Sequence, residues 1–405
     1  MGLLFTKKVS FERLLLLFNK FIGWRRPEKR VGKKRESKAT SLPLDLIFEI
    51  LERLPAKSAV KFRCVSKLWS SITTLPSFIR SFDARSSATG PRLLIVSRTD
   101  KYNQRFVFSI PQNQNSDNQP VVDSYEMTIP TNYCLSCTDS VHGLICITRP
   151  RRVEIWNPTM RRVATLPRPK TGGKDTHGFL GYDPIDGTYK VLCMPTFHLR
   201  HKGKYQPLVF TLGGAQDSWR VIHGVTEHYP LQCGKCINGV VYYVASLEID
   251  GAAWFLVSFH VRSEKMSMIQ VPWSHNRGFL SLYQGKLARV TSNADDITMW
   301  ILEDAEKHEW SCKHFHLPFP SNDPVSNTFL RLKGVNDADE LIYVPRKLVN
   351  PFHILYYHPG RNSFRRVIVD GVADEQFMRR NGLDDKTSLI TISAYSNHID
   401  TLLSF

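Results

Sequence analysis

Residues 143–167 read GLICITRPRRVEIWNPTMRRVATLP, and this stretch contains one complete repeat of the chain. Gly143 precedes the apolar run LICI, the run VEIWNP follows it, and RRVATLP closes the unit. Short apolar runs bounded by turn-forming residues predict β-strands joined by tight turns. The stretch therefore predicts a small antiparallel sheet.

The same pattern recurs along most of the chain. Gly143, Gly187, Gly239, Gly285 and Asp339 each precede an apolar strand, at steps of 44, 52, 46 and 54 residues with a mean of 49. Two more strands follow each of them. Three or four strands at a period near 50 are typical of a blade in a kelch-type β-propeller. A weaker unit before these five, ending at Pro130, brings the predicted number of blades to six.

The predicted ring must be closed. The remaining C-terminal strands, Ser388–Ile392 and Thr401–Leu403, are expected to pair with the first blade, which removes exposed sheet edges. If they formed their own sheet, the ring would have seven blades, and a two-sheet sandwich is an alternative architecture for the same strands. The predicted fold is mainly β, with a propeller of six blades over residues 84–405.

Residues 41–83 have a helical pattern instead. Leu44, Ile47, Leu51 and Leu54 recur at the spacing of one buried helix face, and Pro55 ends that helix. Apolar positions from 60 to 72 predict two further helices, the last of which is expected to stop at Pro76. A three-helix module of about 40 residues is too small to bury all its apolar side chains, so some should stay exposed for another protein to cover.

This segment, SLPLDLIFEILERLPAKSAVKFRCVSKLWSSITTLPSFIRSF, resembles an F-box of the type abundant in plants. The matching positions are Leu42-Pro43, Asp45-Leu46, Glu49–Leu51, Arg53–Pro55, Lys57-Ser58, Phe62–Lys67 and Trp69; Ala59 and Val60 depart from the usual leucines. The resemblance implies binding to a Skp-family adaptor and, through it, to a cullin-based ubiquitin ligase. The residues it implies for that contact are Leu42, Pro43, Leu44, Ile47, Ile50, Leu51, Leu54, Pro55, Val65 and Trp69.

The strand-rich region resembles the F-box-associated domain that follows F-boxes in a large plant family. The resemblance is carried by His142–Cys146, Trp156–Thr159, Phe179–Asp183, Tyr189–Leu192, Ser218–Arg220, Cys236–Gly239 and Trp300–Leu302. It implies a domain that recognises a protein destined for ubiquitination, without identifying that protein. The resemblance therefore implies a receptor without catalytic residues and without a cofactor. A binding protein that has left the ligase and a propeller enzyme are the alternatives.

The net charge of +17 is uneven along the chain. Residues 1–40 contain twelve Lys or Arg and three Glu, so this stretch alone carries +9. This composition predicts a poorly ordered extension that serves as a nuclear-import or electrostatic element. We expect the protein in the nucleus, the cytoplasm or both. The remaining +8 is spread over 365 residues, which argues against specific nucleic-acid binding. No apolar run approaches the roughly 20 residues of a membrane span.

No metal site or catalytic motif is predicted. The pairs Cys134/Cys137 and Cys233/Cys236 lie 99 residues apart, whereas the pairs of a zinc ribbon lie roughly 15–20 apart, so reduced thiols are the better interpretation. His314 and His316 could share one strand face, but a third ligand would have to come from elsewhere. No nucleophile elbow, phosphate loop or paired carboxylates indicate an enzyme.

Target recognition is expected in loops at the propeller rim, because binding residues concentrate on loops held by a rigid scaffold. Polar insertions break the repeat at residues 112–120, 169–177, 198–206 and 318–327. Two basic clusters in or beside these insertions would suit an acidic or phosphorylated target. Their candidate binding residues are Arg168, Lys170, Lys174, Arg200, Lys202 and Lys204.

Overall fold

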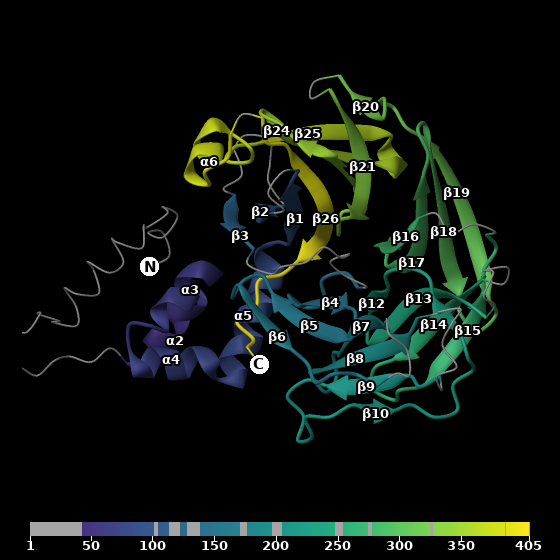
Figure 1. Ribbon diagram of the computed structural model, residues 1–405, viewed down its shortest axis with the longest axis horizontal. Coiled ribbons are helices and arrows are strands. Elements are labelled where there is room, and N and C mark those ends of the chain that lie inside the picture. The colour runs from purple at the N-terminus through teal and green to yellow at the C-terminus, as the bar shows by residue number, and fades with distance from the viewer. Residues whose placement is uncertain are drawn as a thin grey trace, which may run out of the picture. The chain divides into compact units, whose positions relative to one another are not determined.

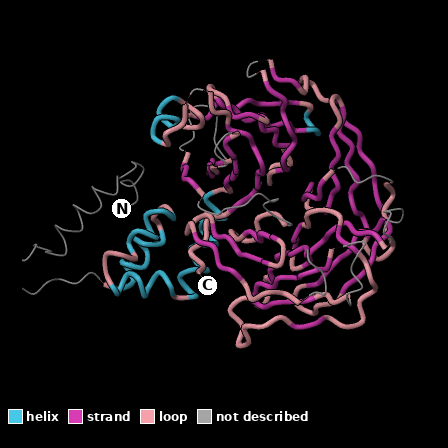
Figure 2. The backbone as a smooth tube through the Cα atoms, viewed as in Figure 1, coloured by secondary structure: helices cyan, strands magenta, loops and turns pink. Residues whose placement is uncertain are grey.

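The computed structural model describes residues 43–100, 104–112, 122–127, 138–170, 176–196, 205–247, 254–273, 278–324, 327–384 and 386–404. The chain divides into two compact units, one ending at Arg85 and the other beginning at Ser86. Helices make up the first unit, and the second is built mainly from strands joined by loops and turns (Figures 1 and 2). None of the helices in the described ranges is long and apolar enough to cross a membrane.

The helical unit consists of short helices that bury one face each. They are α2 (Leu44–Glu52), α3 (Ala56–Phe62), α4 (Lys67–Thr74) and most of α5 (Pro76–Thr89), which continues past the boundary at Arg85. Leu51 and Phe62 are buried, and the Phe62 ring lies against Trp69 with 4.8 Å between ring centroids. Helix α4 ends at Thr74, before Pro76 as predicted, but a fourth helix, α5, begins at Pro76 and was not predicted. The first residue of a helix has no intrahelical use for its N–H, so proline fits this position.

The second unit contains six sheets in the described part of the chain, which we number as blades 1–6. Blade 1 holds β1 (Arg92–Thr99), β2 (Arg105–Pro111), β3 (Asp123–Glu126), β23 (Lys347–Leu348) and β26 (Leu389–His398). Blade 2 holds β4 (Ile145–Arg149), β5 (Arg152–Asn157) and β6 (Arg162–Thr165). Blade 3 holds β7 (Thr176–Asp183), β8 (Thr188–Pro195), β9 (Leu208–Thr211) and β10 (Arg220–Val221).

The other three blades follow in chain order. Blade 4 holds β11 (Tyr229–Pro230), β12 (Lys235–Ile237), β13 (Val240–Ser246), β14 (Trp254–His260) and β15 (Met266–Gln270). Blade 5 holds β16 (Phe279–Tyr283), β17 (Lys286–Ser292), β18 (Asp296–Asp304) and β19 (Glu309–His316). Blade 6 holds β20 (Asn322–Asp323), β21 (Thr328–Val335), β22 (Leu341–Pro345), β24 (Phe352–His358) and β25 (Ser363–Val369). The short helix η1 (Pro359–Arg361) joins β24 to β25, and α6 (Glu375–Arg380) lies between β25 and β26.

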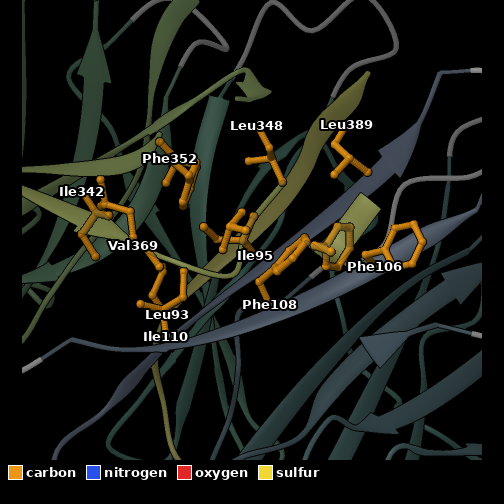
Figure 3. Close-up of a cluster of buried hydrophobic side chains, with 14 of the residues drawn as sticks. Leu93, Ile95, Phe106, Phe108, Ile110, Ile342, Leu348, Phe352, Val369 and Leu389 are labelled. Atoms are coloured by element: carbon orange, nitrogen blue, oxygen red, sulfur yellow. The ribbon is translucent and has the colours of Figure 1, made fainter. Parts of the chain in front are cut away.

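The blades form a closed ring because apolar side chains fill each space between neighbours. Separate clusters of buried residues join blades 1 and 2, 2 and 3, 3 and 4, 4 and 5, 5 and 6, and 6 and 1. Figure 3 shows the last of these, in which Leu93 and Phe108 of blade 1 meet Ile342 and Phe352 of blade 6. These interfaces and the six sheets confirm the predicted propeller and exclude both the seven-blade ring and the sandwich.

The ring closes within blade 1. Strand β26, near the C-terminal end, pairs antiparallel with β1 on one side and with β23 on the other. The prediction that residues 388–392 pair with the first blade is therefore confirmed. The same prediction for Thr401–Leu403 was wrong, because these residues form no strand and lie against blade 2. There the Asn157 side-chain amide donates to the carbonyl oxygens of Thr401 and Leu403, at 3.1 and 2.8 Å.

Candidate functional site

A pocket of about 380 Å³ opens where the innermost strands of the blades end. The strands β4, β7, β12, β16, β21 and β26 lie at or near the edges of their sheets, and each contacts the next in this order from β4 to β26. Each blade contributes to the lining: Asn397 and Ile399 come from blade 1, Ser140–His142 from blade 2, Tyr182 and Pro184 from blade 3, Lys235–Gly239 from blade 4, Leu282 from blade 5 and Asp337 from blade 6. We call it the axial pocket.

The repeat itself places residues at this pocket. His142 and Gly143 have φ values of 45° and 82°, and Asn238 and Gly239 have 48° and 80°. Two consecutive residues with positive φ form the tight hairpin turn that suits the twist of paired strands, which is why glycine recurs at the second position. His142 and Asn238, the residues before these glycines, both line the pocket.

The pocket contains charged and polar groups in an ordered arrangement. Lys235 Nζ lies 2.6 Å from Asp139 Oδ2, and Asp139 Oδ1 accepts a hydrogen bond from the Ser140 backbone N–H at 2.8 Å. The Asn397 side-chain amide donates to the Val335 carbonyl at 3.1 Å, which fixes the orientation of the amide. Its Oδ1 is buried and has no hydrogen-bond partner among the described residues. Asp337 makes no hydrogen bond or ion pair within the same described ranges.

At three neighbouring groups the surroundings shift the pKa in the direction that favours the uncharged form. Loss of hydration lowers the pKa of His142, whose ring packs 4.0 Å from that of Tyr182. Burial raises the pKa of the Cys236 thiol, and partial loss of hydration raises that of the Asp337 carboxyl. Lys235 is already paired with Asp139, so the Asp337 carboxyl is left without an ion-pair partner within the described ranges.

Ser140 and His398 form the arrangement most similar to a catalytic pair. The Ser140 hydroxyl lies 2.8 Å from His398 Nδ1. A serine nucleophile needs a base with a pKa near the working pH and a further group that orients it. Burial lowers the pKa of His398 to about 4, and its Nε2 has no partner in the described part of the chain. The pair therefore has the properties of a structural contact.

The residues implied for adaptor binding fall into two groups. Ile47, Leu51, Leu54 and Trp69 are buried in the core of the helical unit. Pro43, Leu44, Pro55 and Val65 are exposed, Ile50 is half-buried, and Leu42 lies outside the described residues. The expectation that large apolar side chains stay exposed on this small unit is met by Leu44, Leu46, Val65, Leu68 and Leu75, with exposed fractions of 59, 45, 42, 43 and 46%.

The predicted target-binding residues are only partly described. Arg168 and Lys170 are exposed and follow β6. The antiparallel register of β4, β5 and β6 places the end of β6 at the opposite end of the sheet from the axial pocket. These two residues therefore do not line that pocket. Lys174, Arg200, Lys202 and Lys204 lie outside the described residues, so the prediction for both basic loops stays a prediction.

The residues considered for metal binding are not brought together where the structure describes them. No group of three or more His, Cys, Asp or Glu side chains suited to a metal occurs within the described ranges. His316 Nδ1 lies 2.7 Å from Asp296 Oδ1, and His314 Nδ1 lies 3.2 Å from Thr298 Oγ1, all on the outer strands of blade 5. Cys134 and Cys137 lie outside the described residues, and Cys233 is exposed.

Comparison with known proteins identifies both units. Residues 40–81 match the F-box domain, and residues 92–399 match the F-box associated beta propeller domain. The chain is 42% identical to Putative F-box protein At1g47790 of Arabidopsis thaliana over 93% of its own length and 98% of the relative's. It is 39% identical to F-box protein At5g18160 of the same plant, over 91% and 93% of the two lengths. The chain therefore belongs to the family of F-box proteins that carry an F-box-associated β-propeller domain.

Proposed function

We propose that this F-box protein is the substrate-recognition subunit of a Skp–cullin–F-box ubiquitin ligase. In this role the helical unit binds a Skp-family adaptor, and the propeller binds a target protein. The observation that carries the proposal is the set of exposed large apolar side chains on the helical unit, led by Leu44 at 59%. Exposed apolar groups on a module of this size indicate a surface that a partner covers.

The protein needs no catalytic residue for this function. Holding a target near a ubiquitin-loaded enzyme raises the effective concentration of the target's lysines, and this alone accelerates transfer. The assembly would act in the nucleus, the cytoplasm or both. The alternative of a binding protein outside any ligase differs in one respect, since it would bind a target but no adaptor.

Adaptor binding can be tested at an exposed position without disturbing the core. Leu44→Asp places a charge in the proposed interface, and we expect adaptor affinity to fall by tenfold or more, since central apolar anchors often contribute over 1 kcal/mol. Ile185→Asp is the matched control, because Ile185 is 73% exposed on a propeller turn. Co-purification of adaptor and cullin with each full-length variant gives the measurement. If Leu44→Asp retained the adaptor as well as Ile185→Asp does, the assignment would be wrong.

A further inference from the structure

The axial pocket contains acceptors that no donor satisfies. The Asn397 Oδ1 is buried and lacks a hydrogen-bond partner among the described residues, and the Asp337 carboxylate, on an exposed residue, has no partner there either. They belong to the same corner of the pocket, because the Asn397 amide bonds to the carbonyl of Val335, two residues before Asp337. A buried acceptor without a partner is costly, and a ligand that donates hydrogen bonds would remove that cost.

The charge balance favours the same kind of ligand. The ammonium of Lys235 is held at 2.6 Å by Asp139, so it does not neutralise Asp337 through direct contact. A cation entering the pocket would find the Asp337 carboxylate without a direct ion-pair partner in the described ranges, and a neighbouring amide oxygen. Tyr182 also lines the pocket, and an aromatic ring attracts cations.

The rest of the lining suits an aliphatic stem. Val141, Ile237, Leu282 and Ile399 contribute apolar surface from four different blades. Lysine and arginine combine a chain of methylene groups with a charged head that only donates hydrogen bonds. A volume of about 380 Å³ lies at the lower end of the range typical of ligand pockets. This size suits a side chain better than a folded domain.

We infer that the axial pocket binds a lysine or arginine side chain of the target protein, with Asp337 and Asn397 accepting hydrogen bonds from its cationic head. This inference rests on the proposed function, in which the propeller recognises the target. The inferred binding site lies at the end of the ring opposite to Arg168 and Lys170. It would recognise a basic residue of the target, whereas Arg168 and Lys170 would recognise an acidic one.

The experiment is a selection of displayed random peptides on the full-length chain, followed by affinity measurement with a fluorescent copy of the best peptide. We expect one position to be enriched in lysine or arginine. Replacing that residue with glutamine in the probe should weaken binding by at least tenfold, and Asp337→Asn should do the same. Because both changes remove one interaction, their effects should not add. Asp217→Asn, an identical change at an exposed residue that does not line the pocket, is the control and should bind like the wild type.

A second variant tests the charge argument in the opposite direction. Lys235→Gln removes the cation that competes for the carboxylates, so the affinity for the same probe should rise several-fold. The inference would be overturned if the selected peptides had no basic position, or if the wild-type chain selected no peptide. Equal binding of the probe by the wild type and by Asp337→Asn would also overturn it. The proposed function is tested separately by adaptor co-purification, so either can fail while the other holds.

Discussion

His398 should make the propeller sensitive to acid. This residue lies at the end of the closing strand β26, is only 1% exposed, and contacts Ser140 through Nδ1. Burial lowers its pKa from 6.5 to about 4, an effect that Arg92 adds to and Asp400 and Asp139 oppose. The folded protein therefore holds this imidazole neutral, whereas the unfolded chain takes up a proton near pH 6.5.

The sign and size of the effect follow from these two pKa values. A histidine with a lowered folded-state pKa contributes stability that is fully present above pH 6.5 and is lost as the pH falls toward 4. Each pKa difference of one corresponds to about 1.4 kcal/mol. Between pH 7.5 and pH 4.5, protonation of His398 should therefore lower the free energy of unfolding by about 2.5 kcal/mol.

Urea unfolding followed by far-ultraviolet circular dichroism at pH 7.5 and pH 4.5 measures this loss. His398→Gln should be less stable at both values, but its stability should fall by about 2.5 kcal/mol less than that of the wild type. Burial also lowers the pKa of His228 and His353, but both are present in both proteins, so the difference isolates His398. His314→Gln, at an exposed position, should behave like the wild type. Equal losses in the wild type and His398→Gln would refute the reasoning.

Three further predictions concern packing and the N-terminal extension. Gly181→Ala should lower the free energy of unfolding by about 1–3 kcal/mol in thermal denaturation, because its Cβ would lie 2.5 and 2.8 Å from two valine side chains of blade 4. Gly214→Ala, where the nearest atoms are 3.4 Å away, should cost far less, and equal effects would contradict this account. Leu51→Ala, at a fully buried position, should destabilise the helical unit by about 2–5 kcal/mol, whereas Leu44→Ala should leave its melting temperature nearly unchanged. Deleting residues 1–40 should change the distribution of a fluorescent fusion between nucleus and cytoplasm and leave adaptor co-purification intact; loss of the adaptor would place these residues in the docking module.

The sequence predicts the blades well because each is a local feature. Gly143 and Gly239 mark hairpin turns that need positive φ, and the apolar runs beside them are the strands of one sheet. The missed helix α5 has a local cause too, since Pro76 follows the end of α4 and also begins α5. At Thr401–Leu403 an apolar run suggested a strand, but the Asn157 side chain satisfies two of its backbone carbonyls in place of a neighbouring strand.

The axial pocket was beyond sequence reasoning for a different reason. Asp139, Lys235 and Asp337 are about 100 residues apart in sequence, and only the closed ring brings the ends of their blades together. A signal was present, because pocket residues such as His142 and Asn238 directly precede the repeat glycines. The position of these residues indicates a shared pocket only once it is known that the turns lie together at the axis of the ring.

The pairing of β1 with β26 also sets a time for folding on the ribosome. About 290 residues separate the end of β1 from the start of β26, and at roughly 5–20 residues per second their synthesis takes roughly 15–60 s. Throughout this interval β1 has one edge without its native partner, while the helical unit has already been made. A chain interrupted before residue 389 would carry an intact F-box sequence beside an open propeller whose unpaired edge invites aggregation. If the helical unit binds an adaptor as proposed, such fragments would occupy adaptors without carrying a completed propeller.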